Sequence, residues 1–294
     1  MPTTRLGRLA RIGLAAGELA AGGLAESVRR IGGKKGDETV NALLTATNAR
    51  KLAKRLSSMR GAAMKIGQVL SMEGADILPP EFTEAMAILR DSADTMPDTQ
   101  VRRVMGREFG KGWENLFEHF DFQPIAAASI GQVHRAQTRD GRDIALKIQY
   151  PGVARSIDSD VDNMALLLRM LNILPVELDT DGITAEAKRQ LRQEADYLAE
   201  AGFLKEYANL VRNNDRLLVP AVHEDLSSRR VLAMDYLPGE PLESLAADGV
   251  DPALRDSVGK ELERLLFREL FEFRTMQTDP NFANYLYRPE EDRI

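Results

Sequence analysis

The stretch Gln277-Thr278-Asp279-Pro280-Asn281-Phe282-Ala283-Asn284 decides the fold of this 294-residue chain. It follows an amphipathic run and leads into the short apolar segment Tyr285-Leu286-Tyr287. An aspartate and an asparagine five residues apart suit phosphoryl transfer, because the carboxylate can orient a hydroxyl or water while the amide holds a metal ion on nucleotide phosphates. Turns are also rich in Asp, Pro and Asn, so this spacing is a weak signal until other segments support it.

Upstream, residues 124–136 form a small-residue turn that feeds a predicted strand, and Asp140-Gly141 predicts a hairpin. The return strand is Asp143–Gln149, in which apolar residues alternate around Lys147. A strand lysine 14 residues after Val133 matches a protein-kinase arrangement, in which a flexible loop covers the nucleotide phosphates and the lysine grips them.

The loop departs from the template G-x-G-x-x-G-x-V. The corresponding positions are Ala126, Ala128, Gly131 and Val133, so alanine replaces two glycines. The backbone therefore cannot approach a phosphate in the usual way at those two points.

Helical periodicity dominates the first 110 residues or so. Apolar residues recur at helical spacing from 38 to 70, and within this run Lys65 and Gln68 share one helix face. The segment 78–82 predicts a break and a helix start, followed by a helix to Leu89. A further helix begins near Pro97 and runs to about Phe109.

Further helices are predicted over 154–174, over 184–211 and over 255–273, and strands over 216–223 and 229–237. The second helix carries Glu194 and Glu200, which are six residues apart and so do not share one face. Two separate acidic partners are therefore available. The residues after Tyr236, Leu237-Pro238-Gly239, break the chain as a hinge between two lobes would.

Charge is distributed unevenly. The net charge is −6, but residues 1–60 carry +8 and the remaining residues −14. A basic head on an acidic body predicts contact with an anionic surface, and membrane lipid is the leading candidate. Aromatic residues are not interleaved with these charges, which argues against nucleic acid. The absence of Cys excludes disulfides and a cysteine nucleophile, and the three histidines have no metal-ligand spacing.

The basic tail has two remaining interpretations. Glu18 and the surrounding glycines interrupt the apolar core that a signal peptide needs, and no run of about 20 apolar residues could span a bilayer. An interfacial helix with arginines along one side and a loosely docked tail both fit residues 1–33. Residues 33–38 are predicted to form a linker.

Taken together, these motifs resemble the UbiB/ADCK/AarF family of atypical protein-kinase-like proteins, in the branch whose catalytic loop reads Gln-Thr-Asp-Pro-Asn. The resemblance covers about residues 40–294 and rests on five motifs, which are the alanine-rich loop, the Ile-Ala-Leu-Lys strand, the glutamate-bearing helix, the Met-Asp-Tyr-Leu hinge and the D-x-x-x-x-N loop. The Lys-x-Gly-Gln helix ahead of them narrows the match. It implies an α+β, protein-kinase-like fold with an N-terminal helical extension and an incomplete C-terminal lobe.

The resemblance also implies roles for the nucleotide-binding residues. Lys147 would contact the α- and β-phosphates of ATP and pair with Glu200, and Asp279 would be the catalytic aspartate. Asn284 would be a ligand of Mg²⁺. The remaining cofactor contacts would come from the loop and the hinge, with Met234 in the gatekeeper position: Ala126, Ala127, Ala128, Ser129, Gly131, Val133, Met234, Asp235 and Leu237.

A second set of residues belongs to the helix that the family inserts ahead of the kinase-like part. Lys65 and Gln68 would lie over the place where a protein substrate binds, with Lys65 reaching Glu194 and Asp196 as its companion. Such a helix would exclude polypeptide substrates. Similar proteins act as ATPases or small-molecule kinases and support ubiquinone biosynthesis at membranes.

The chain lacks one motif that the fold needs. Asp-Phe-Gly, which supplies the principal metal ligand, does not occur, and the predicted hairpin from Tyr285 ends at Ile294. The chain therefore reads as a truncated version of a longer protein, which would turn over ATP barely above background. The apolar residues Leu265, Leu266, Leu270 and Phe273 would then lose much of their packing surface.

Four regions follow from this interpretation: a basic tail (1–37), a helical extension (38–112), a kinase-like N-terminal lobe with inserted helices (113–240) and the start of a C-terminal lobe (241–294). The function would be that of an ATP-binding ATPase or small-molecule kinase that supports ubiquinone biosynthesis at a membrane, with ubiquinone-biosynthesis proteins as partners. The location would be peripheral to a bacterial inner membrane or on the matrix side of a mitochondrion. The alternative is a non-catalytic, nucleotide-binding scaffold for lipid biosynthesis.

Overall fold

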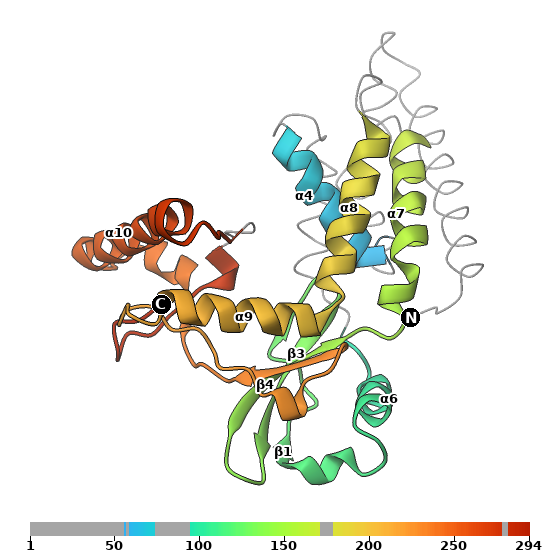
Figure 1. Ribbon diagram of the computed structural model, residues 1–294, viewed down its shortest axis with the longest axis horizontal. Helices are drawn as coiled ribbons and strands as arrows, with labels where there is room; N and C mark the ends of the chain where they lie inside the picture. Colours follow the sequence, from blue (N-terminus) through green and yellow to red (C-terminus); the bar gives the residue numbers. More distant parts are fainter. Residues whose placement is uncertain (1–55, 57–58, 74–94, 171–178, 278–281) are drawn as a thin grey trace, which may run out of the picture.

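The computed structural model describes residues 56, 59–73, 95–170, 179–277 and 282–294 (Figure 1). The predicted tail, the linker, most of the helix predicted over 38–70 and the helix predicted to end at Leu89 lie outside the described residues. Asp279 and the side chain of Gln68 lie outside them as well.

A five-stranded antiparallel sheet forms the centre of the molecule. Its strands run in the order β1-β3-β4-β5, with β2 paired to β3. Their bounds are Phe117–Phe120 for β1, Ala126–Ala127 for β2, Gly131–Thr138 for β3, Asp143–Gln149 for β4 and Val231–Asp235 for β5. The predicted hairpin is confirmed, because Gly141 takes the left-handed conformation (φ 90°) between β3 and β4.

The two faces of the sheet have different partners. Ile144, Leu146 and Ile148 of β4 are buried on one face against α6 (Asp98–Glu108) and Trp113, which begins the short helix η2 (Trp113–Leu116). Lys147 alternates with them and points to the opposite face, where α9 (Tyr197–Val211) lies across the sheet (Figure 1). The strand pattern thus fixes which side carries the lysine.

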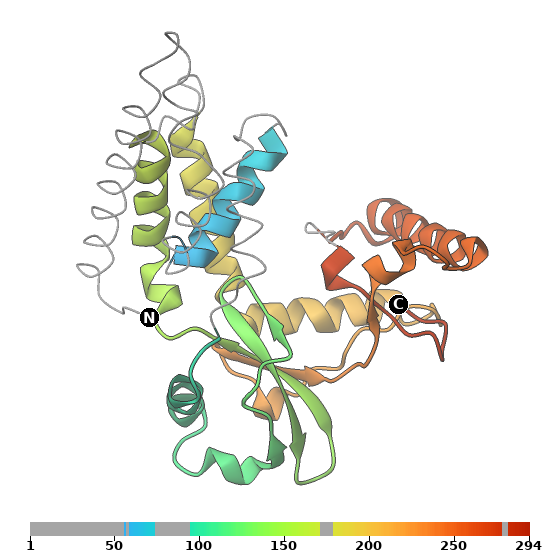
Figure 2. The ribbon, with the colours of Figure 1, turned by 180° about the vertical axis from the view of Figure 1, so that it is seen from behind.

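A second group of helices stands beside the sheet (Figure 2). It consists of α4 (Arg60–Glu73), α7 (Val153–Met170) and α8 (Thr180–Glu194), which share one apolar cluster. Leu56, Ile66 and Leu191 are among its most buried members. This cluster extends to Ile130 at the start of β3 and to Leu232 of β5, so the helical group is packed onto the sheet.

Two predictions about the middle of the chain are wrong. The helix predicted over 184–211 is two helices, α8 and α9, because Asp196 accepts hydrogen bonds from the backbone amides of Leu198 and Ala199 and so caps a new helix. The strand predicted over 216–223 is reduced to a single bridge between Val222 and Met234. Pro220 within it has no N–H to donate to a strand ladder.

The part after the hinge is small. Helix α10 (Pro252–Arg268) continues into a π-helical turn, η5 (Glu269–Phe273), and β6 (Glu240–Pro241) pairs with β7 (Leu286–Tyr287). The remaining short helices are η3 (Glu224–Leu226), η4 (Leu242–Ala246) and η6 (Phe282–Asn284). The predicted terminal hairpin is present, because Arg288 and Arg293 form a bridge across its turn.

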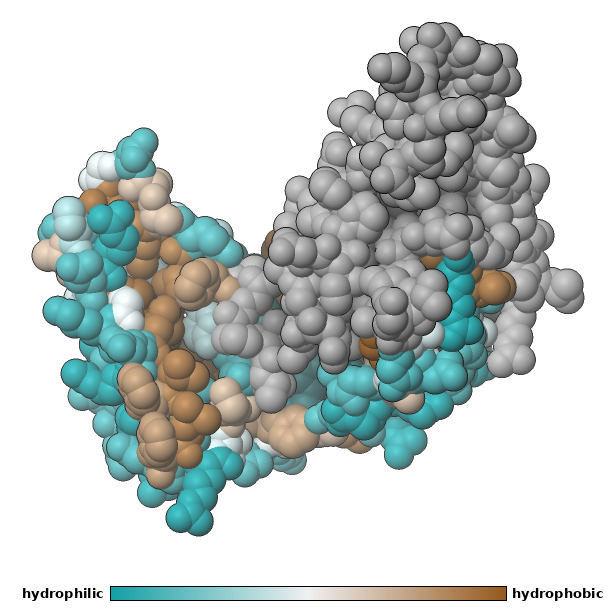
Figure 3. All heavy atoms as spheres, turned by 90° about the horizontal axis from the view of Figure 1, so that it is seen from above, coloured by the Kyte–Doolittle hydropathy of each residue, from teal (hydrophilic) through white to brown (hydrophobic). Residues whose placement is uncertain are grey.

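Helix α10 has an exposed apolar side, which forms a brown band in Figure 3. Leu266 and Phe267 of α10 are exposed there, and the exposed side continues into η5 with Leu270 and Phe271; the exposure of Leu266 and Leu270 was predicted. Leu265 is buried and Phe273 is half-buried in the cluster around Leu242 and Leu245, so the prediction was wrong for these two residues. They differ because Leu265 and Phe273 lie eight residues apart, on the same face of a helix.

A buried polar chain joins β3 to the start of α6. The Nδ1–H of His134 donates to the carbonyl of Asp121 (2.8 Å), and its Nε2 accepts from Gln132 Nε2 (2.7 Å). Gln132 Oε1 accepts in turn from the backbone N–H of Met96 (2.8 Å). Only a neutral imidazole can accept at Nε2. Burial lowers the pKa of His134, while Asp121 and Asp98 act in the opposite direction.

This arrangement predicts that the protein loses stability as pH falls below about 6.5, the pKa of a histidine in the unfolded chain. Below that value His134 binds a proton in the unfolded state but not in the folded state. The free energy of unfolding therefore falls by up to about 1.4 kcal/mol per pH unit. Melting temperatures at pH 7.5 and pH 5.5 test this. The drop should be about 2–4 °C smaller in a His134→Gln variant. Equal drops in the two proteins would contradict the prediction, since carboxylates elsewhere titrate in both.

Candidate functional site

Lys147 and Glu200 form an ion pair on the open face of the sheet. The Nζ of Lys147, on β4, lies 2.7 Å and 2.9 Å from the two carboxylate oxygens of Glu200, on the first turn of α9. Both side chains are partly exposed. An ammonium group has three hydrogens, so one donor remains for a ligand. This is the pairing that the family resemblance implies for these two residues.

Tyr197 lies beneath this pair. Lys147 Nζ sits 4.9 Å from the centre of the Tyr197 ring, and the side chain of Tyr197 is fully buried. Its hydroxyl has no hydrogen-bond partner among the described residues. Burial raises the pKa of the phenol, and the charges of Glu200 and Glu194 raise it further, so the ring stays neutral. The neutral ring therefore stabilises the ammonium group of Lys147 through a cation–π contact.

Gly131 begins β3 directly above Tyr197. A Cβ atom at this position would lie 2.4 Å from the carbonyl oxygen of Ile148 and 3.0 Å from the hydroxyl of Tyr197. Close packing against β4 and Tyr197 therefore explains why this position is a glycine. Any contact of Gly131 with a cofactor stays a prediction.

The alanine-rich loop lies over this region. Ala126 and Ala127 are exposed on β2, and the backbone N–H of Ala128 closes a tight turn by donating to the carbonyl of Gly131 (2.9 Å). Val133 stands directly opposite Lys147 in the β3–β4 register and shares its face of the sheet. The loop, Val133 and Lys147 thus form one continuous surface.

Helix α4 is fastened to this loop through one carboxylate. Ser129 Oγ donates to Glu194 Oε2 (2.9 Å), and the ammonium of Lys65 makes an ion pair with the other oxygen of Glu194. Helix α4 also comes close at Gly61, where a Cβ would lie 2.9 Å from a methyl of Ile130. The contact of Lys65 with Glu194 is the one that the resemblance implies. The contact of Ser129 with Glu194 was not predicted.

Asp196 has a local task. Its carboxylate accepts from the backbone N–H groups of Leu198 (3.2 Å) and Ala199 (3.4 Å), which caps α9. A carboxylate at a helix N-terminus is favoured by the helix dipole. Asp196 thereby fixes the start of the helix that presents Glu200.

The hinge residues lie at the end of β5. Met234 is opposite Ala145, on the face that carries Lys147. The backbone N–H groups of Asp235 and Tyr236 donate to the carbonyls of Ala221 and Asp143. In the described part of the chain, no partner is found for the N–H of Leu237.

The predicted metal ligand is Asn284. Asn284 ends the short helix η6 and is exposed, while Asp279 lies outside the described residues. Within the described ranges, no group of three or more His, Asp or Glu side chains is arranged to hold a metal ion. The role of Asn284 as a metal ligand stays a prediction.

Comparison with known proteins assigns the family. The model of the ABC1 atypical kinase-like domain matches residues 88–294. The chain belongs to this ABC1 atypical kinase-like family. The resemblance drawn from the motifs is thereby confirmed, and so is the predicted α+β, kinase-like fold.

Relatives of this ABC1-family chain come from several organisms. The atypical kinase coq-8, mitochondrial, of Caenorhabditis elegans is 41% identical over 97% of this chain and 38% of its own length. The atypical kinase COQ8, mitochondrial, of Saccharomyces cerevisiae is 34% identical over 100% of this chain and 58% of its own. The Rv3197 protein of Mycobacterium tuberculosis, solved with erythromycin, superposes with a TM-score of 0.58 at 32% identity, over 87% of this chain and 64% of that one.

The ABC1-family chain spans about half the length of the curated relatives that it matches. In the part that the structure describes, every helix falls short of the length and apolarity that crossing a bilayer requires.

Sequence reasoning about this ABC1-family site missed Tyr197 and Gly61. Tyr197 follows the Glu-x-Asp motif, but nothing in its spacing indicates burial under Lys147. Gly61 had a usable signal, because Gly61-Ala62-Ala63 is a run of small residues on a helix, and such runs permit close approach of another segment.

Proposed function

We propose that the chain binds ATP with Mg²⁺ on the face of the sheet that carries Lys147, and that it belongs to a kinase-like ATPase or small-molecule kinase supporting ubiquinone biosynthesis. The observation that carries the proposal is the ion pair between Lys147 and Glu200. A strand lysine held by a helix glutamate is the arrangement that grips nucleotide phosphates in kinases. The printed names of the relatives, atypical kinases, agree with it.

The surroundings of Lys147 fit a nucleotide. Lys147 has one ammonium hydrogen left for a phosphate oxygen, beneath the loop formed by Ala126, Ala127, Ala128 and Ser129. At the other end of the same face, Met234 would border the adenine ring. The backbone of Leu237 and of Asp235 would hold its edge.

Two residues would contribute to binding the metal ion and to orienting the attacking group. Asn284 would offer an amide oxygen and Asp279 would orient the attacking group. When bound, Mg²⁺ neutralises charge on the transferred phosphate. A hard cation prefers anionic oxygen ligands, and Asn284 is neutral. We therefore expect weak metal binding by these 294 residues and ATP turnover close to background.

Helix α4 supports the exclusion of protein substrates. We infer that Lys65 and Gln68 form a barrier over the substrate side, held down by the contact of Lys65 with Glu194 and by the cap that Asp196 provides to α9. A small-molecule substrate, or water, would then receive the phosphate. We also propose that residues 1–37 form an arm that contacts anionic lipid, and that the boundaries near 112 and 240 separate the extension and the two lobes.

Nucleotide binding by the purified chain tests the proposal. The melting temperature should rise with millimolar ATP and rise further with added Mg²⁺, whereas AMP, which lacks the β- and γ-phosphates, should have a smaller effect. Equal effects of ATP and AMP would contradict a site built around phosphate contacts. Hydrolysis in the same samples should stay close to background. The same assay on a chain extended by an Asp-Phe-Gly segment separates the two functions, because a scaffold would bind ATP without turnover even then.

A further inference from the structure

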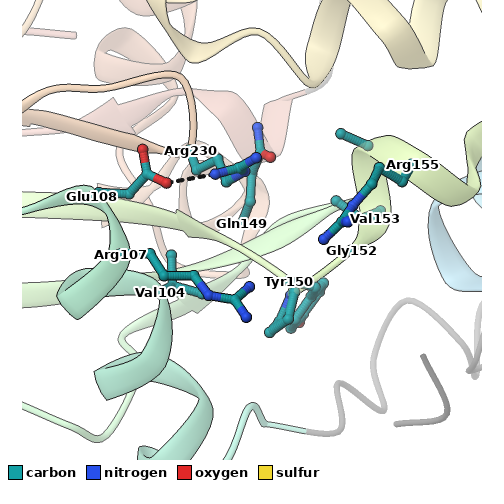
Figure 4. Close-up of a pocket in the computed structure, with 11 residues that line it drawn as sticks. Val104, Arg107, Glu108, Gln149, Tyr150, Gly152, Val153, Arg155 and Arg230 are labelled. Carbon is teal, nitrogen blue, oxygen red and sulfur yellow. Dashed lines mark hydrogen bonds and ion pairs between the residues drawn. The ribbon is translucent and has the colours of Figure 1, made fainter.

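A second pocket lies where β4 ends and the chain turns into α7 (Figure 4). It is a small hollow that is partly open to solvent. Three elements contribute to it: α6, the turn from β4 into α7, and the residue preceding β5. Its lining includes three guanidinium groups, from Arg107, Arg155 and Arg230.

Among the described residues that line the pocket, positive charge exceeds negative charge. Arg230 makes an ion pair with Glu108 (2.7 Å), which is the one carboxylate in the lining. Arg107 and Arg155 make no ion pair with any described residue. In Figure 4 their side chains extend from α6 and from α7 toward the space between the two helices. The described residues therefore provide no ion-pair partner for the two exposed guanidinium groups of Arg107 and Arg155.

The first turn of α7 adds to this positive character. Gly152 precedes the helix with φ 83°. The N–H groups of Val153 and Arg155 are used by the carbonyls of Tyr150 and Gly152, whereas that of Ala154 has no partner among the described residues. The positive end of an 18-residue helix thus faces the same space as the arginines.

We propose that this pocket binds a phosphate group, as a phosphomonoester or as the headgroup of an anionic lipid. A tetrahedral dianion presents oxygens in several directions, which suits guanidinium donors arriving from three separate elements. A ligand with a single carboxylate would pair with only one of these guanidinium groups. The proposal is independent of ATP binding at Lys147, because the pocket shares no residue with that site.

Hydrogen bonds from one lining residue, Gln149, connect the pocket to the rest of the fold. Gln149, which lines it, is buried and donates its Nε2 to the carbonyls of Ala195 (2.7 Å) and Arg229 (3.2 Å). Its side chain is therefore held by the junction between α8 and α9. This support keeps the floor of the pocket rigid while the arginines supply the contacts.

The test compares two variants with equal loss of charge. Arg107→Gln with Arg155→Gln removes the two unpaired guanidinium groups. Arg139→Gln with Arg212→Gln removes two exposed arginines at the β3–β4 turn and at the end of α9. The probes are inorganic phosphate, with chloride at matched ionic strength as the reference, and vesicles of phosphatidylcholine with or without phosphatidic acid. Melting temperatures follow the first probe and co-sedimentation the second.

We expect the half-saturating phosphate concentration to rise at least about tenfold in the pocket variant and to stay unchanged in the control, since charged hydrogen bonds contribute about 1.5–3 kcal/mol each. A matching loss of sedimentation with phosphatidic acid would identify a lipid headgroup as a ligand. A loss confined to inorganic phosphate would identify a soluble phosphate compound. Equal behaviour of the two variants toward both probes would overturn the proposal.

Discussion

Replacing Lys147 with alanine should lower the affinity for ATP at least about tenfold. The ammonium would contribute a charge-assisted hydrogen bond to a phosphate, and such bonds are worth about 1.5–3 kcal/mol, where 1.4 kcal/mol corresponds to a factor of ten. The fold should survive, because both Lys147 and Glu200 are partly exposed and water can replace the lost partner. Calorimetric titration with ATP in the presence of Mg²⁺ gives the dissociation constants of the unmodified chain and of the variant directly.

Lys205→Ala is the matched control for Lys147→Ala. Lys205 also makes an ion pair, with Glu224, and it lies on α9, but on the exposed side of the helix. Its removal takes away one lysine and one ion pair without touching the face that carries Lys147. An ATP affinity that is the same in Lys147→Ala, Lys205→Ala and the unmodified chain would show that the nucleotide does not bind at this lysine.

Replacing Gly131 with alanine should destabilise the fold by about 1–3 kcal/mol or more, the usual cost of forcing an additional group into a packed core. The new methyl would lie 2.4 Å from the carbonyl oxygen of Ile148 and 3.0 Å from the hydroxyl of Tyr197. Backbone cannot yield as a flexible side chain can, so β3 and β4 would have to separate. We expect the melting temperature to fall by at least about 3 °C.

Gly259→Ala provides the control for Gly131→Ala. Gly259 lies on the exposed side of α10, and a Cβ at that position meets no atom within 4 Å. Alanine is favoured over glycine in a helix by up to about 1 kcal/mol, so this variant should melt at the same temperature or higher. A melting temperature of Gly131→Ala within about 1 °C of the unmodified chain would show that the contact with Ile148 is relieved at little cost.

The features predicted correctly are those that short stretches of sequence encode. The alternation around Lys147 specifies a strand, and Asp140-Gly141 specifies the turn before it, so the hairpin follows from local patterns. The helix start at Pro97 is equally local. The break at Asp196 was missed because no Gly or Pro marks it, and a capping aspartate reads like any other polar residue within a helical run.

The remaining differences depend on contacts between distant segments. The burial of Tyr197 requires α9 to lie across β3 and β4, which no spacing within its own helix can indicate. The shared use of Glu194 joins residues that are 65 positions apart, from Ser129 to Glu194. The motifs identified Lys65, Ser129 and Glu194 one by one, and only the fold brings them to a single carboxylate.

The carboxylate of Glu194 couples movement of the alanine-rich loop to movement of helix α4. Glu194 holds the alanine-rich loop through Ser129 and helix α4 through Lys65. If a ligand draws Ser129 away, the free energy with which Glu194 retains Lys65 changes. By linkage, displacement of α4 must then alter the affinity of the loop for that ligand by the same factor. A molecule that binds only α4 would thus act as an effector of whatever binds beneath the loop, without contacting it.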